Sequence, residues 1–214
     1  MATNLKPRVA HPTRRLHWGL AQQTMPGENA SGDAALVLEL PQGCLLAVAD
    51  GLGHGAEAAA ASGAAMQILR DRPSGDILQL LRACHEGLRP TRGVVMSLAW
   101  LNFEDEIMTW AGVGNVAGML LRAGGVGEGA REHLLCRAGV LGAQMPPPCA
   151  AITFIAPGDT LLFFTDGVHP GPATAFNDVL SSPDRAAATL LRTSARGTDD
   201  ALVLVARLEG EAQP

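Results

Sequence analysis

The sequence lacks the features of several large classes of protein. Its 214 residues carry a formal net charge of −5 and only 17% charged residues, so nothing favours electrostatic capture of nucleic acid or of an anionic membrane. No apolar run is long enough to span a bilayer, and the basic segment 1–17 has no apolar core of the kind found in signal peptides. We therefore expect a cytoplasmic protein with neither a membrane nor a nucleic-acid partner.

Closely spaced cysteines are also missing. No CxxC pair occurs among the four cysteines, which suit small core positions in a reducing compartment (Cys44, Cys84, Cys136, Cys149). Internal repeats and linker-like breaks in composition are absent too. With 47% hydrophobic residues the chain can bury a full core. We expect a monomer with one domain over residues 1–214, in which residues 1–15 are irregular.

Apolar runs separated by turn residues divide the chain into short strands and a few helices. We expect strands over 16–24, 34–40, 44–49, 94–101, 107–111, 117–122, 151–156, 160–165 and 201–208. Helices are expected over 56–70, 76–88, 174–181 and 183–194. Residues 112–115 predict a bend or a bulge, and residues 124–129 a flexible glycine loop.

One stretch combines a short apolar strand, a carboxylate and a glycine turn. Asp50 ends the strand, and Gly51, Gly53 and Gly55 alternate with other residues before an alanine-rich helix. Glycines at such a turn allow positive φ and close approach to a ligand. A carboxylate beside exposed carbonyls suits a hard cation. Taken alone, the stretch fits an ordinary strand-to-helix turn with a capping aspartate equally well.

Other aspartates occupy similar positions at strand ends. Asp33 begins one strand of a tight hairpin and Asp50 ends the other, so both carboxylates lie at the same end of a sheet. Asp166 follows a second apolar strand and precedes Gly167, and Asp199 precedes the last strand. Isolated aspartates of this kind are usually caps or turn formers. Clustered without Cys or His ligands, they favour Mg²⁺ or Mn²⁺ over zinc.

In this order, these motifs resemble those of the metal-dependent (type 2C) serine/threonine phosphatases, and more closely those of their bacterial SpoIIE-like branch. The resemblance runs from about Trp18 to about Arg207 and rests on five segments (Ser31–Asp33, Val48–Gly55, Gly112–Asn115, Phe163–Val168, Thr198–Asp200). It implies an α+β fold, a four-layer αββα sandwich of two antiparallel sheets flanked by helices.

Carried over residue by residue, the resemblance implies a dinuclear Mg²⁺ or Mn²⁺ site. Asp50 would bridge two ions and the Gly51 carbonyl would bind one of them. Asp166 and Asp199 would complete the coordination of the second ion, and Asp33 would hold a third ion or its water ligands. Water activated by the cations would attack phosphoserine or phosphothreonine. The implied substrates are phosphorylated scaffold and antagonist proteins of a stressosome-type signalling complex.

The chain departs from the patterns of the family at three points. Leu52 stands where the eukaryotic branch has a histidine thought to protonate the leaving alkoxide, and His54 comes two residues later. His54 is therefore either a catalytic general acid or a histidine that packs in the turn. Leu202 replaces a threonine of the last motif, and no arginine matches the phosphate-binding arginine of the eukaryotic enzymes.

Two other kinds of function fit part of the sequence. Gly51, Gly53 and Ala56, with Asp71 further along, fit the fingerprint of an NAD(P)- or nucleotide-binding α/β enzyme. That alternative requires a parallel sheet and leaves Asp166 and Asp199 unexplained. The glycine spacing fits a histidine-kinase-type ATPase less well. A phosphatase fold that only binds a partner is the other alternative, but it gives no reason to keep four like charges together.

Overall fold

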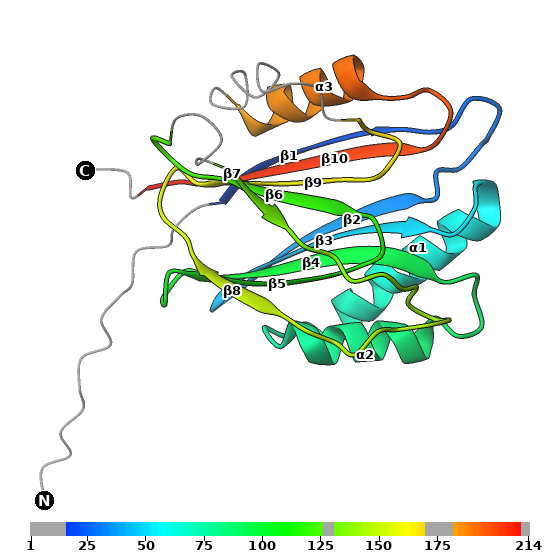
Figure 1. Ribbon diagram of the computed structural model, residues 1–214, viewed down its shortest axis with the longest axis horizontal. Coiled ribbons are helices and arrows are strands. Elements are labelled where there is room, and N and C mark those ends of the chain that lie inside the picture. Colours follow the sequence, from blue (N-terminus) through cyan, green and yellow to red (C-terminus); the bar gives the residue numbers. More distant parts are fainter. Residues whose placement is uncertain (1–15, 126–130, 170–181, 211–214) are drawn as a thin grey trace, which may run out of the picture.

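The computed structural model describes residues 16–125, 131–169 and 182–210, and these residues form two antiparallel sheets packed face to face (Figure 1). One sheet has the strand order β1 (Leu16–Gln23), β10 (Ala201–Leu208), β9 (Thr160–Phe164), β6 (Ala117–Leu121), β7 (Arg131–Leu134). The other has the order β2 (Asp33–Leu40), β3 (Gly43–Gly51), β4 (Val94–Asn102), β5 (Ile107–Val113), β8 (Ala151–Phe154).

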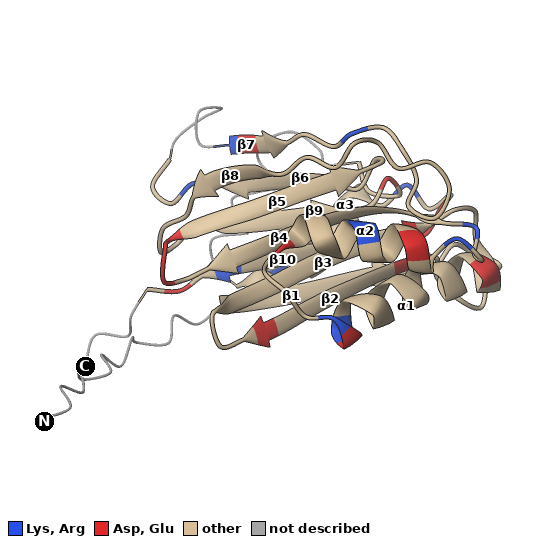
Figure 2. Cartoon of the chain, turned by 90° about the horizontal axis from the view of Figure 1, so that it is seen from below, with Lys and Arg blue, Asp and Glu red and all other residues tan. Residues whose placement is uncertain are grey.

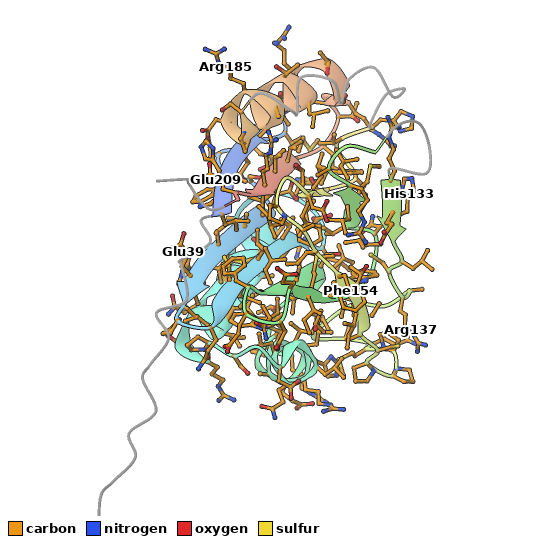
Figure 3. The ribbon with its side chains drawn as sticks, turned by 90° about the vertical axis from the view of Figure 1, so that its left-hand side faces the viewer. Glu39, His133, Arg137, Phe154, Arg185 and Glu209 are labelled. Carbon is orange, nitrogen blue, oxygen red and sulfur yellow. The ribbon has the colours of Figure 1, made fainter. Side chains whose placement is uncertain are left out.

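Helices cover the outer face of each sheet and complete the four layers (Figure 1). Helices α1 (Gly55–Asp71) and α2 (Ile77–Gly87) lie on the sheet that contains β3, and α3 (Pro183–Ser194) lies on the other. The expected αββα sandwich is therefore confirmed. Arg185 of α3 projects away from the sheets, as an outer helix requires (Figure 3). None of the helices in the described ranges could cross a membrane, because none is both long and apolar enough.

The strand β3 shows why the sequence builds these layers. Its residues 44–49 are fully buried, and because side chains alternate along a strand they enter two different cores. One set packs beneath α1 and α2 (Leu45, Ala47, Ala49), and the other packs between the sheets (Cys44, Leu46, Val48). A third apolar cluster lies beneath α3. Charged residues are accordingly concentrated on helices, turns and strand ends (Figure 2).

The elements differ from the sequence expectations mainly at their ends. Strand β3 continues through Gly51, and β7 was not expected. The expected irregular segment 1–15 and the helix over 174–181 lie outside the described residues, as does most of the glycine loop over 124–129. Every pairing between the named strands is antiparallel. The dinucleotide-binding alternative is therefore wrong, because it needs a parallel sheet.

Candidate metal centre

Two carboxylates meet at one end of the β2–β3 hairpin. Asp33 pairs directly with Asp50 in the antiparallel register, as the hairpin predicted, and directly opposed residues project to the same face of a sheet. Along β3, Asp50 continues the alternation of Cys44, Leu46 and Val48. Both carboxylates therefore project to the side that faces the second sheet.

The second sheet brings two more aspartates to the same end. Asp166 follows the end of β9 and Asp199 precedes β10, and these two strands are antiparallel neighbours. Asp50, Asp166 and Asp199 line one cavity of about 630 Å³, together with His54 and Asn115 among others. Carboxylates from both sheets thus converge on one space.

The remaining two expected metal ligands do not line this cavity. Asp33 is only 4% exposed, and its Oδ2 accepts a hydrogen bond of 2.7 Å from the Thr165 hydroxyl on the opposite sheet. Thr165 Oγ1 in turn accepts the backbone N–H of Leu202 at 2.9 Å. Gly51 is buried against α1, because a Cβ there would lie 2.2 Å from the Ala58 carbonyl oxygen. This glycine is needed for close helix packing.

Burial and repulsion between neighbouring carboxylates raise the pKa values of Asp33 and Asp50. Burial, followed by the charges of Asp166, Asp199 and Asp200, raises the pKa of Asp50 to about 7. Burial is also the main cause that raises the pKa of Asp33 to about 8, with the neighbouring aspartates adding to it. Like charges held this close favour the uptake of positive charge, whether as protons or as cations.

The donor set suits a hard divalent ion. Within the described ranges, no group of three or more carboxylate, His or Cys side chains is arranged so that it could hold a metal ion by itself. Mg²⁺ does not need one, since it usually keeps several waters and uses one or two carboxylates. Asp50, Asp166 and Asp199 offer only oxygen donors. Oxygen donors suit Mg²⁺ or Mn²⁺ better than zinc, so these residues fit the expected ions.

Some residues that shape the centre were not singled out from the sequence. Asp200 is buried, and its carboxylate accepts the backbone N–H groups of Met25 and Gly32, each at 2.7 Å. It ties the loop before β2 to the start of β10. Asn115 Nδ2 donates to Asp166 Oδ2 at 2.8 Å and holds that carboxylate in place. Both residues stand within the motifs described above, but the sequence does not reveal these contacts.

His54 lies at the cavity and not within a packed turn. Its side chain is 59% exposed, which argues against the turn-packing alternative. Its Nδ1 lies 2.5 Å from Glu28 Oε1, in the loop before β2. No sequence pattern points to this partner, because Glu28 stands in a run of ordinary turn residues.

The αββα sandwich with acidic strand ends defines a class of fold, and comparison with known proteins identifies the family. The model of the family described as Stage II sporulation protein E (SpoIIE) matches residues 41–209. The chain therefore belongs to the SpoIIE family. Phosphoserine phosphatase RsbX of Bacillus subtilis (strain 168) is 30% identical over 95 residues, which are 44% of this chain and 48% of that protein. The match thus spans about half the length of this curated relative.

Solved structures share the fold along most of the chain. One comes from work on "The bacterial stressosome: a modular system that has been adapted to control secondary messenger signaling". It is 30% identical with a TM-score of 0.83, and the match covers 90% of this chain and 100% of that one. RsbX in complex with magnesium is 22% identical with a TM-score of 0.79, and the match covers 91% and 96% of the two chains. These similarities support the four-layer arrangement independently.

Proposed function

We propose that this protein is a metal-dependent serine/threonine phosphatase that hydrolyses phosphoserine or phosphothreonine on other proteins. The observation that carries the proposal is the convergence of Asp50, Asp166 and Asp199 from two sheets on one cavity. Membership of the SpoIIE family and partial identity to a phosphoserine phosphatase support the same activity.

In this proposal the acidic cluster holds two Mg²⁺ or Mn²⁺ ions. Asp50, the Gly51 carbonyl, Asp166 and Asp199 would hold these two ions, and Asp33 would hold a further ion or its waters. When bound, the ions supply an activated water as nucleophile and neutralise charge on the phosphoryl oxygens.

The chain itself keeps the carboxylates in place. Thr165 links the Asp33 carboxylate to the backbone of the opposite sheet, and Asn115 holds Asp166. Asp200 fixes the loop that leads into Asp33 by accepting two backbone N–H groups. Such supporting contacts matter, because loss of a partner of a metal ligand typically weakens metal binding about 10–100-fold.

The proposed substrates are phosphorylated scaffold and antagonist proteins of a stressosome-type complex. Support comes from the full-length match to a chain solved in work on the bacterial stressosome and from the partial match to RsbX. A cavity that reads the phosphoryl group through metal ions offers few side-chain contacts for selecting a sequence. Selectivity then depends on the folded partner, through a small or moderate transient interface.

Metal titration with an activity assay tests the proposed reaction. Turnover of p-nitrophenyl phosphate should rise with Mn²⁺ and disappear with a chelator, and Asp50→Asn should lose several orders of magnitude in kcat while remaining folded. Asp71→Asn is the matched control, because Asp71 is an exposed carboxylate of α1 that accepts a hydrogen bond from Gln67. Turnover that resists chelation, or full activity of Asp50→Asn, would contradict the proposal.

A second assay tests the substrate class. The cognate scaffold is phosphorylated by its kinase, and kcat/KM on the intact protein is compared with that on a short phosphopeptide from the same site. We expect the intact protein to be the better substrate. Equal turnover of the peptide would rule out selection by a folded partner, and activity confined to an antagonist protein would exclude the scaffold as substrate.

A further inference from the structure

Glu28 and His54 form a carboxylate–imidazole pair at the mouth of the acidic cavity. The Glu28 Oε1 to His54 Nδ1 distance is 2.5 Å, and His54 lines the same cavity as Asp50, Asp166 and Asp199. A hydrogen bond at Nδ1 fixes both the orientation of an imidazole ring and the position of its proton. Nε2 is then the ring nitrogen left for the cavity.

The glycine turn before α1 is shaped around this pair. Gly53 and Gly55 have φ angles of 87° and 74°, in the left-handed region that glycine tolerates, and His54 between them is extended. A Cβ on Gly55 would lie 2.6 Å from Glu28 Oε2, so a side chain there would push the carboxylate from this position. The turn thus both presents His54 and admits its partner.

We propose that Glu28 is the positioning residue for His54 and that His54 protonates the leaving serine or threonine oxygen. This inference rests on the phosphatase activity proposed above. As water attacks phosphorus, the bond from phosphorus to the alcohol oxygen breaks and its electron pair stays on that oxygen. Nε2 of protonated His54 gives its proton to the oxygen, and the neutral ring keeps Nδ1–H on Glu28. The ring then regains a proton from solvent.

We assign the proton transfer to His54 and not to the charged side chains near it. Asp50, Asp166 and Asp199 are committed as oxygen ligands in the proposed metal centre, so they are not proton donors there. Glu57, in the first turn of α1, is paired with Arg92, which lies beside Gly53.

The leaving group provides the decisive test. An alkyl oxygen leaves as a strong base and needs a proton, whereas p-nitrophenolate leaves without one. With Mn²⁺ present, His54→Gln should lower kcat on a phosphoserine peptide about 100-fold or more, within the usual range for general acid catalysis. Glu28→Ala should lower it about tenfold, since misplaced catalytic groups lose rate steeply. In both variants, KM and kcat on p-nitrophenyl phosphate should change less than about twofold, because this leaving group needs no proton.

A double variant and a matched control separate positioning from a structural role. Glu28→Ala should cause no further loss in His54→Gln, because residues that act as one unit are not additive. Glu57→Ala removes a carboxylate from the same region and should leave the peptide kcat unchanged. Additive losses, or equal losses on both substrates, would overturn the inference. A wild-type protein inactive on both substrates would instead overturn the phosphatase proposal itself.

The pair can also be tested without metal or turnover. In ¹⁵N NMR spectra of the metal-free protein at alkaline pH, neutral His54 should carry its proton on Nδ1, and Glu28→Ala should shift it to Nε2. Exposed ion pairs contribute little to stability, so both proteins should fold alike. A wild-type ring protonated mainly on Nε2 would overturn the positioning role, whatever the activity assays show.

Discussion

Replacing Asp33 by asparagine should stabilise the metal-free protein near pH 8, and this gain in stability should disappear as the pH falls. Asp33 is 4% exposed, and burial raises its pKa from 3.8 to about 8. The folded state therefore holds this proton to a higher pH than the unfolded state does. Between about pH 4 and pH 8 the unfolded state binds fewer protons, so the stability of the wild type falls as the pH rises through that window.

The size of the effect on stability follows from the pKa shift of Asp33. One pKa unit corresponds to about 1.4 kcal/mol, so a shift of about four units destabilises the folded state by up to about 5 kcal/mol at pH 8. Asparagine carries no charge and keeps an oxygen that can accept the 2.7 Å hydrogen bond of Thr165. Its buried amide N–H groups need partners, which costs about 1–3 kcal/mol. A net gain of at least about 2 kcal/mol at pH 8 remains.

Urea unfolding in the presence of a chelator, repeated from pH 4 to pH 8, measures this effect. At pH 4 the midpoint of Asp33→Asn should lie below that of the wild type, because only the amide cost remains there. Towards pH 8 it should rise above the wild-type midpoint, while Asp71→Asn should follow the wild type throughout. The contribution of Asp50, whose pKa burial also raises, remains in all three proteins. Parallel curves for wild type and Asp33→Asn would refute the reasoning.

Three further substitutions test contacts around the site, and a fourth serves as a control. Asn115→Ala removes the donor to Asp166 and should weaken activation by Mn²⁺ about 10–100-fold in a metal titration. Thr165→Val leaves buried hydrogen-bonding groups without a partner and should lower the urea-unfolding free energy by about 1–3 kcal/mol. Gly51→Ala places a Cβ 2.2 Å from a carbonyl oxygen of α1 and should cost about 1–3 kcal/mol, whereas Gly63→Ala, with open space inside the helix, should stabilise by about 0.5–1 kcal/mol.

The parts of the fold that sequence could predict are those set by local pattern. The β2–β3 hairpin follows from two apolar runs around Pro41–Gly43, and its register brings Asp33 opposite Asp50. Strand β10 and helix α3 have the expected bounds. Strand β7 was missed, because its four residues, Arg-Glu-His-Leu, have no strand pattern and pair only with β6 within the described residues. The layer arrangement itself came from family resemblance.

Contacts between distant segments could not be predicted from the sequence. Thr165 reaches Asp33 across 132 positions, and Asp200 reaches Gly32 across 168. Glu28 reaches His54 from a loop whose composition shows only that it turns. Each contact depends on how the two sheets face one another, which no local pattern encodes. The sequence identified acidic strand ends, and the structure shows which of them line the cavity and which support it.

Asp199 and Asp200 are the clearest case of that distinction, and exchanging each for asparagine tests it. Asp199 lines the cavity, whereas Asp200 is 4% exposed and accepts two backbone N–H groups at 2.7 Å. An asparagine at 200 offers one acceptor oxygen and turns an N–H towards the other donor, so it leaves a buried N–H unpaired. Asp200→Asn should therefore lose about 1–3 kcal/mol in urea unfolding. Asp199→Asn should keep its unfolding midpoint but lose Mn²⁺-dependent kcat on p-nitrophenyl phosphate. The opposite pattern, with stability lost at 199 and activity lost by a stable variant at 200, would show that the metal ligand and the structural aspartate have been assigned the wrong way round.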